Sequence, residues 1–325
     1  MSKFIYSLSL IAFGLLLGVV IQVLAGRGWI RLPLPTDRLR RRLQQIALLG
    51  INPVAIVGAI WAIRTHDISL AFLPFIGFFS LLAGGLLALA AARLMDLPPR
   101  KAGAMFGCGS FTNIGSIGAL VCFVFLGEAG FALVPIYKLF EEFSYYALGF
   151  PIAKLYSDRS AAGEGSWVRV KRLARDPFIL TALSAILLGG ILNVSGIRRP
   201  EAYAALNTVL VPLGTVILLT SIGLAMRFRR VRDYLAESSA VALIKFALVP
   251  AAATTLAWWA GLGDVQEGLP LKVVLILSSM PVAFNALIPP SLYDLDLDLA
   301  NSCWFVTTFL LVLVLPGLLL VMQRI

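Results

Sequence analysis

Two apolar stretches of this chain are interrupted by residues that a continuous membrane helix would avoid. The stretch Gly107–Leu120 (GCGSFTNIGSIGAL) places four glycines around a short polar segment. The stretch Ser278–Tyr293 (SSMPVAFNALIPPSLY) contains one asparagine and three prolines. Glycine and proline interrupt helical hydrogen bonding, and backbone groups freed inside a membrane must be satisfied by protein or by water. Two interrupted spans of this kind indicate the binding site of a transporter.

The chemistry that these two stretches favour is the binding of a small anion. A broken helix presents unpaired N–H groups and a partial positive charge at the N-terminus that follows the break. Two such ends facing one site can bind a carboxylate without an arginine. The substrate-binding residues that we predict are Asn113, Asn285, Ser110, Thr112, Ser116 and Pro281. The two asparagines can also act only as caps of the broken helix ends, and the sequence leaves both roles open.

Three charged residues, Lys138, Glu141 and Glu142, lie inside the later apolar stretch 130–155. On a helix, Lys138 can meet Glu141 three residues later or Glu142 four residues later. Charged groups inside a membrane span are costly unless they are paired or hydrated, which makes them functional candidates. We predict that they couple transport to a proton or to Na⁺, because the lysine neutralises one carboxylate and leaves the other to bind a cation. A closed structural ion pair is the alternative.

Five further charged residues are weaker candidates. Lys245 and Lys272 lie near the ends of their expected spans, where long side chains reach the interface with water. Asp294, Asp296 and Asp298 alternate as in a cation-binding turn, but a loop exposed to solvent is the expectation that we prefer.

Composition excludes several classes of protein. Hydrophobic residues make up 59% of the 325 residues and charged residues 14%, far from the balance of a soluble domain. The chain is therefore predicted to be an integral membrane protein with room for about ten spans. Its formal charge of +10 comes from basic residues in loops between apolar stretches, which indicates cytoplasmic loops and not nucleic-acid binding. We expect neither an enzyme nor a resident cofactor or metal, because the sequence has no GxxxxGKS/T motif and no nucleophile–base or metal-ligand spacing within the spans.

The apolar stretches divide the chain into two halves of five spans each. The expected spans cover about residues 4–25, 44–63, 70–92, 102–126 and 130–155, and then 177–194, 202–226, 238–260, 269–292 and 299–322. We expect residues 1–156 and 177–325 to form two repeats, joined by a cytoplasmic linker at 157–176. Because an odd number of spans reverses the next copy, the repeats are inverted. Most basic loop residues follow spans one, three, five and seven, which places both termini outside the cell.

Several short motifs carry a family resemblance. They are Asn113-Ile-Gly115-Ser-Ile-Gly118 with Phe125-Leu-Gly127-Glu128, Arg175-Asp176-Pro177, Leu192-Asn193-Val-Ser195-Gly196, Ser221-Ile-Gly223-Leu224, and Met280-Pro281-Val-Ala-Phe-Asn285-Ala with Tyr293-Asp294-Leu. Their order and spacing resemble the auxin efflux carrier (PIN-like) family, within the bile, arsenite and riboflavin transporter superfamily. Asn113, Pro281 and Asn285 match that family's crossover residues. Leu120 stands where members often have a proline, so the first break must depend on glycines and polar residues.

The resemblance implies an all-α fold of ten transmembrane helices in two inverted five-helix repeats, with helices four and nine broken and crossed. It implies a bundle of spans three to five and eight to ten that moves against a panel of spans one, two, six and seven, with a homodimer formed through the panel. The implied function is secondary transport of a small organic anion, such as an auxin-like carboxylate or a dicarboxylate, by alternating access. The short central loop suggests a bacterial inner-membrane member. The alternatives are a sodium-coupled carrier of the bile-acid type and a membrane receptor that binds an anion without transporting it.

Overall fold

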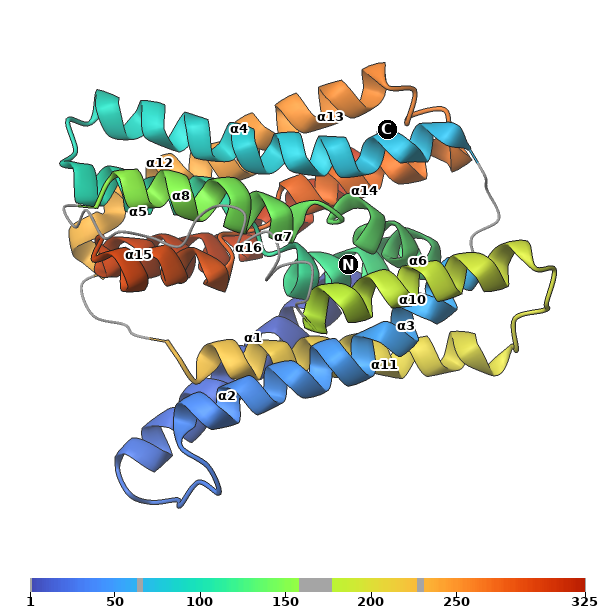
Figure 1. The fold of residues 1–325 in the computed structure, drawn as a ribbon, viewed down its shortest axis with the longest axis horizontal. Coiled ribbons are helices and arrows are strands. Elements are labelled where there is room, and N and C mark those ends of the chain that lie inside the picture. Colours follow the sequence, from blue (N-terminus) through green and yellow to red (C-terminus); the bar gives the residue numbers. More distant parts are fainter. Residues whose placement is uncertain (1, 63–66, 158–176, 227–230, 325) are drawn as a thin grey trace. The chain divides into compact units, whose positions relative to one another are not determined.

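All regular elements in the part of the chain that the structure describes are helices (Figure 1). The computed structural model describes residues 2–62, 67–157, 177–226 and 231–324, so the expected linker lies outside the described residues except for Ser157. Within these ranges, seven helices are long and apolar enough to cross a membrane: Ile5–Gly26, Arg38–Trp61, Ile68–Leu94, Ile114–Tyr137, Ala202–Gly223, Val231–Trp259 and Leu297–Met322. The chain is an all-α, multi-pass membrane protein.

Two compact units make up the fold, and each draws on both halves of the sequence. Unit 1 comprises Met1–Thr65, Gly115–Pro135 and Pro177–Arg227. Unit 2 comprises His66–Ile114, Ile136–Asp176 and Phe228–Ile325. Unit 1 therefore contains the residues of the expected spans one, two, six and seven, with residues 115–135 added. The grouping follows contacts between distant parts of the sequence and not the order of the chain.

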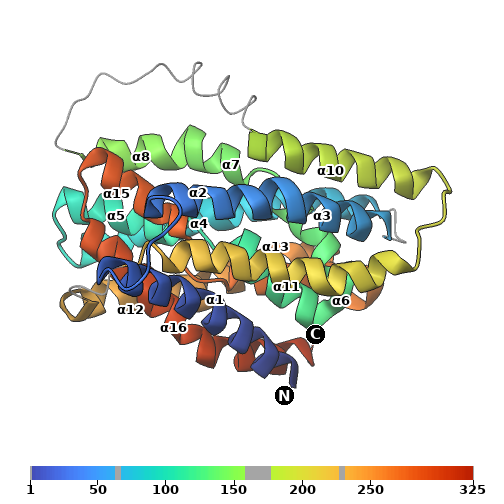
Figure 2. The same ribbon diagram turned by 90° about the horizontal axis from the view of Figure 1, so that it is seen from below.

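Unit 1 contains a layer of packed helices (Figure 2). Its elements outside residues 115–135 are α1 (Ser2–Gly26), α2 (Thr36–Gln45), η1 (Ile46–Ile51), α3 (Asn52–Trp61), α10 (Pro177–Val194) and α11 (Ala202–Gly223). The helices α2, η1 and α3 form one rod that packs between α10 and α11, and α1 packs on α11. Gly18 of α1 permits this close approach, because a methyl group in its place would overlap the carbonyl oxygen of Thr220.

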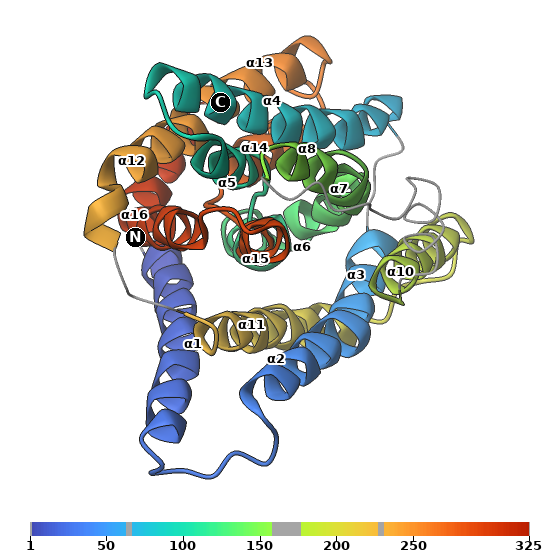
Figure 3. The same ribbon diagram turned by 60° about the vertical axis from the view of Figure 1, so that its left-hand side comes forward.

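Unit 2 contains the two helices that lead into the breaks, α5 and α14 (Figure 3). Its elements are η2 (Ile68–Phe72), α4 (Leu73–Leu94), α5 (Pro99–Ser110), α7 (Glu141–Phe143), η4 (Ser144–Gly149), α8 (Phe150–Leu155), η5 (Val231–Tyr234), α12 (Leu235–Leu243), η6 (Ile244–Leu248), α13 (Val249–Trp259), η7 (Gln266–Gly268), α14 (Leu269–Ser278), η8 (Phe284–Leu287), α15 (Ile288–Tyr293) and α16 (Leu297–Met322). The helix α5 packs against α4, α8 and α16, and α14 packs against α13 and α4.

The segment that connects the units, η3 (Ile114–Gly118) followed by α6 (Ala119–Tyr137), is bent sharply at Gly127. The backbone angles there, φ 73° and ψ −163°, are ones that only glycine adopts without strain. The bend falls between the expected spans 102–126 and 130–155. Beyond it, the expectation of one continuous helix over 130–155 is wrong, because α6 ends at Tyr137 and α7 begins at Glu141. Pro135, in the last turn of α6, removes a backbone donor from the helix just before this interruption.

In the described ranges, three π-helical turns interrupt long helices, and each ends two residues before a proline. The turn η1 precedes Pro53, η4 precedes Pro151 and η6 precedes Pro250. Inside a helix, proline cannot donate to the preceding turn and its ring presses on the carbonyl four residues earlier, and the wider π turn accommodates the ring. Such turns often occur at functional sites. Here η4 contains Tyr145 and η6 contains Lys245.

Candidate functional site

The two interrupted stretches meet at a short antiparallel bridge inside unit 2. The backbone N–H of Asn113 donates to the carbonyl oxygen of Pro281 at 2.9 Å, and the N–H of Ala283 donates to the carbonyl oxygen of Phe111 at 2.9 Å. Thr112 therefore lies opposite Val282. These bonds satisfy backbone groups that the ends of α5 and α14 release, as the membrane interior requires.

Neighbouring helices hold both strands of this bridge. On the second strand, the N–H of Val282 donates to the hydroxyl oxygen of Thr307 in α16 at 3.2 Å. The first strand follows α5, which packs closely on α4. A methyl group on Gly109 would overlap the carbonyl oxygen of Gly84, and a methyl group on Gly84 would overlap that of Gly109. Leu120, at the position of the missing proline, is fully buried in α6. The first break thus uses glycines and polar contacts in place of that proline.

Lys245, in the π turn η6, donates hydrogen bonds to two oxygens at the first break. Its side chain is buried, with only 1% of the residue exposed. The ammonium nitrogen Nζ lies 2.6 Å from Oγ1 of Thr112 and 3.4 Å from the carbonyl oxygen of Ser110, the last residue of α5. The expectation that Lys245 lies near the end of its span and reaches the interface is wrong. The apolar helix begins at Val231 and not at about 238, so Lys245 is at its middle.

A second group of polar side chains reaches the same break from η4 and the turn before α7. The ammonium nitrogen of Lys138 lies 2.8 Å from Oε2 of Glu141. The hydroxyl of Tyr145 lies 2.8 Å from Oε1 of Glu141 and 3.3 Å from the carbonyl oxygen of Thr112. The predicted Lys138–Glu141 pair therefore forms, but across a turn and not within a continuous helix. The side chain of Glu142 lies outside the described part of the chain.

The structure brings most of the predicted binding residues to this crossing. Ser110, Thr112 and Asn113 are all buried, and Pro281 contributes its carbonyl oxygen to the bridge. Asn285 is half-buried in η8, just after the second strand. Ser116 is buried in η3, three residues after Asn113 in the chain. The weaker candidate Lys272 donates to the carbonyl oxygen of Glu267 near the start of α14.

The charged side chains described around the first break are two lysines and one glutamate. Among the described side chains around the first break, Lys138 and Glu141 form an ion pair, and the hydrogen-bond partners of Lys245 are neutral oxygens. When all three are ionised, this group carries one net positive charge. A buried ammonium without a carboxylate partner is unfavourable, and an anion at the crossing would compensate it. No cluster of metal-ligating side chains occurs among the described residues.

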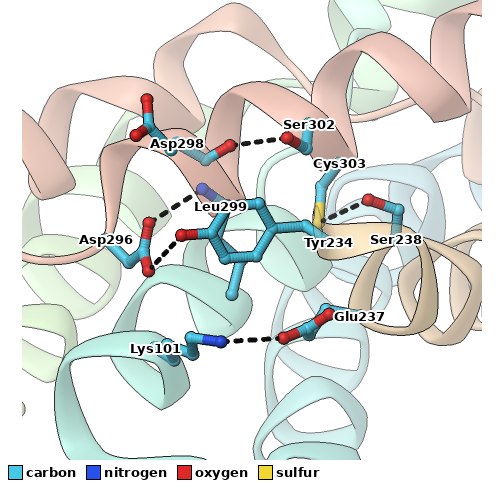
Figure 4. Close-up of polar contacts among 9 residues, drawn as sticks. All are labelled: Lys101, Tyr234, Glu237, Ser238, Asp296, Asp298, Leu299, Ser302 and Cys303. Atoms are coloured by element: carbon cyan, nitrogen blue, oxygen red, sulfur yellow. Dashed lines mark hydrogen bonds and ion pairs between the residues drawn. The ribbon is translucent and has the colours of Figure 1, made fainter. Parts of the chain in front are cut away.

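A second polar cluster joins the first turns of α5, α12 and α16 (Figure 4). The ammonium nitrogen of Lys101 lies 3.1 Å from Oε1 of Glu237 and 4.9 Å from the ring centroid of Tyr234. The Tyr234 hydroxyl donates to Oδ2 of Asp296 at 3.0 Å, while Oδ1 of Asp296 accepts the N–H of Leu299 and caps α16. The cluster links the helix that leads to Lys245 with the helix that leads to the first break.

The expectation of a solvated loop at Asp294, Asp296 and Asp298 is wrong for Asp296, which is half-buried at the start of α16, whereas Asp294 is exposed in a turn as expected. Asp296 caps a helix and accepts the Tyr234 hydroxyl. Asp294 forms an ion pair with Arg100 at 3.0 Å. Both carboxylates are used to connect helices in the described structure.

Unit 1 contains a polar cluster of its own at the bend of α6. Arg199 donates from Nη2 to Oε1 of Glu128 at 2.6 Å and from Nη1 to Oε2 at 2.9 Å. Asn207 of α11 donates from Nδ2 to the same Oε1 at 2.7 Å. The carboxylate next to Gly127 is thereby attached to α11 and to the loop before it. A bidentate arginine–carboxylate pair fixes both distance and orientation.

Two curated archaeal proteins resemble the chain over most of its length. A protein of Methanothermobacter thermautotrophicus named an uncharacterized transporter is 26% identical over 302 residues, which cover 93% of this chain and 92% of that protein. A protein of Methanocaldococcus jannaschii, also named an uncharacterized transporter, is 29% identical over 254 residues, 76% of this chain and 78% of that protein. A comparison with protein-family models found no match.

Proposed function

We propose that this protein is a secondary transporter that binds a small organic anion at the crossing of its two broken helices. The observation that carries the proposal is the buried ammonium of Lys245, which donates to two neutral oxygens at the first break. The similarity to two proteins named as transporters supports the general function, and the resemblance of the crossover motifs to the auxin efflux carriers supports the substrate class.

The positive charge at the crossing has several sources that favour an anion. Lys245 lies at the C-terminal end of α5, where a cation is favoured by the exposed carbonyl groups. The helix that follows the first break begins at Ile114 and the one that follows the second begins at Phe284, and each presents N–H groups at its start. We assign the carboxylate of the substrate to this region, with Asn113 and Asn285 as its side-chain partners.

For the topology we propose ten spans in two inverted repeats, with both termini outside a prokaryotic cell membrane. The antiparallel bridge between the two broken stretches supports this arrangement, because inverted repeats bring corresponding breaks together in opposite directions. The grouping of expected spans one, two, six and seven in one compact unit supports two bodies that move relative to one another. We place the crossing on the moving body and a homodimer contact on the other.

We favour a carrier that works without sodium over the bile-acid type. A sodium ion at the first break would need oxygen ligands such as the carbonyl of Ser110 and the hydroxyl of Thr112. The ammonium of Lys245 already uses both oxygens. If a coupling ion exists, we propose that it is a proton, exchanged in the group formed by Lys138, Glu141 and Tyr145.

The test is counterflow of labelled pyruvate and malonate in proteoliposomes, with Lys245→Met as the variant and Lys272→Met as its matched control. We expect the wild type to exchange at least one of the two anions. Lys245→Met should reduce exchange at least tenfold, because it removes the charge and keeps a long apolar side chain. Lys272, which is half-buried and donates to the carbonyl oxygen of Glu267 near the start of α14, should tolerate the same change.

Two outcomes would contradict this proposal. Equal exchange by wild type and Lys245→Met would remove the buried ammonium from the binding site. Saturable binding of an anion without any counterflow would instead favour a receptor. Repeating the measurement with sodium replaced by potassium distinguishes the sodium-coupled alternative, which requires exchange to fall.

A further inference from the structure

Trp304 in α16 has a buried polar group whose role the fold does not explain. The residue is only 1% exposed. Its indole nitrogen Nε1 is fully buried and has no hydrogen-bond partner among the described residues. Trp61 offers a contrast, because its Nε1 donates to the carbonyl oxygen of Ile197 at 3.0 Å. Buried donors are nearly always paired in folded proteins, so an unpaired one points to a partner outside the chain.

The position of Trp304 relates this donor to the second break. Trp304 precedes Thr307 by three residues, so both lie on the same face of α16. Thr307 accepts the N–H of Val282, which belongs to the second strand of the bridge. The ring of Trp304 lies edge-to-face with that of Phe284, with ring centroids 6.3 Å apart, and Phe284 is the neighbour of Asn285. The unpaired donor is therefore on the helix face that packs against the second break.

We propose that the indole N–H of Trp304 donates a hydrogen bond to the substrate and selects anions that carry a second oxygen acceptor. This inference rests on the proposed function. The two donors lie beside different strands of the bridge: Lys245 in η6 donates to Thr112 on the first strand, and Trp304 in α16 packs on Phe284, which follows the second. A substrate held by both needs a carboxylate for Lys245 and a keto, hydroxyl or second carboxylate oxygen for Trp304.

If no ligand reached position 304, a side chain without a polar atom would give a more stable core there than an indole with an unpaired N–H. Phenylalanine or leucine at position 304 would pack beside Phe284 and bring no N–H that needs a partner. Met280 and Val282, on the second interrupted stretch, are fully buried apolar residues, so an apolar side chain is compatible with this region. We therefore expect the indole N–H to meet an acceptor during the transport cycle.

The test compares propionate with pyruvate, which differ only by the keto oxygen, and adds malonate as a dicarboxylate. Binding to the purified full-length protein is measured by calorimetry for wild type, Trp304→Phe and the control Trp61→Phe. Benzothienylalanine at position 304 serves as a second variant, because it keeps the shape of the indole and replaces N–H by sulfur. Thermal unfolding without ligand is recorded for all four proteins.

We expect wild type to bind pyruvate or malonate roughly tenfold more tightly than propionate, the effect of one buried hydrogen bond. Both changes at position 304 should reduce this ratio to about twofold or less, whereas Trp61→Phe should preserve it. The benzothienyl variant should unfold at the wild-type temperature or above.

Three outcomes would overturn the inference. An unchanged ratio in the benzothienyl variant would show that the N–H does not contact the substrate. A lower unfolding temperature of that variant without ligand would show that the N–H has a partner within the fold. If none of the three anions binds to wild type, the proposed anion site fails, and the role of Trp304 fails with it.

Discussion

The ammonium nitrogen of Lys245 lies 2.6 Å from the hydroxyl oxygen of Thr112, at the point where the first interrupted stretch crosses the second. These two residues are 133 positions apart in the sequence. Their contact attaches the helix α12–η6–α13 to the first strand of the bridge. It also gives the crossing a charge that neither interrupted stretch contains.

The first prediction tests that contact in the protein without substrate. Thr112→Val keeps the shape of the side chain and leaves the buried ammonium with one neutral acceptor fewer. We expect a loss of about 1–3 kcal/mol in the free energy of unfolding. In the background of Lys245→Met the same change should cost much less, because the two residues act as a pair. The measurement is denaturant-induced unfolding in detergent.

A matched control for this prediction is Thr308→Val. The hydroxyl of Thr308 donates to the neutral carbonyl oxygen of Trp304 within its own helix, at 2.8 Å. We expect this change to alter the free energy of unfolding by about 0.5 kcal/mol or less. Equal losses at the two threonines would mean that the ammonium gains nothing from Thr112.

The two breaks were predictable from the residues, and their crossing only from the family resemblance, whereas the lysine beside the first break was not predictable. Glycine, proline and polar residues inside apolar stretches mark breaks directly, because continuous helices exclude them. No such residue pattern points to Lys245, and its position along the membrane span depends on where its helix begins. A start at about 238 places it near an end, and the observed start at Val231 places it at the middle. A proline five residues later, Pro250, was the available signal for the π turn that contains it.

Partners across long distances in the sequence were beyond prediction for a different reason. Glu128 belongs to a motif of the resemblance, but its pairing with Arg199 depends on how α10 and α11 pack on α3. Local spacing predicted that Lys138 could pair with Glu141 or Glu142, and the pair with Glu141 is formed. The state of the Trp304 N–H was not predictable, since only the packed core determines whether a buried donor finds an acceptor.

The second prediction concerns the bidentate pair beside the bend of α6. Lysine at position 199 keeps the charge but cannot form two parallel bonds with Glu128. The two side chains are 16% and 21% exposed, so solvent screens them little. We expect Arg199→Lys to lower the free energy of unfolding by about 1–3 kcal/mol. Thermal unfolding in detergent and in lipid measures this loss.

The exposed pair Arg100–Asp294 provides the comparison for the buried one. Its side chains are 46% and 56% exposed. Arg100→Lys should therefore change the free energy of unfolding by roughly 0.5 kcal/mol or less. A loss at position 100 as large as that at position 199 would contradict the importance of the bidentate geometry at Glu128.

The third prediction tests the close packing of α5 on α4. Alanine at Gly109 places a methyl group against the backbone of Gly84, which cannot move without shifting a helix. We expect Gly109→Ala to cost about 1–3 kcal/mol of unfolding free energy and to weaken anion binding, because α5 leads directly into the first break. Gly317→Ala is the control, since nothing lies within 4 Å of the added methyl group, and it should be neutral or stabilising. Similar losses for the two variants would show that general helix effects, and not this contact, determine the result.

The fourth prediction uses charge to locate the anion. Glu141 is bridged to the first break through Tyr145, whose hydroxyl lies between the carboxylate and the carbonyl oxygen of Thr112. Glu141→Gln removes a negative charge near the proposed site and should tighten malonate binding by roughly three- to tenfold, while Lys138→Gln should weaken it by a similar factor. Calorimetry at low and at high salt measures both effects.

Two outcomes would contradict the prediction. The affinity for malonate could change in the same direction in both variants, or it could change in neither, as for an anion bound far from the crossing. Opposite signs that persist at high salt require an anion close to the ion pair, because screening removes the interactions between distant exposed charges first.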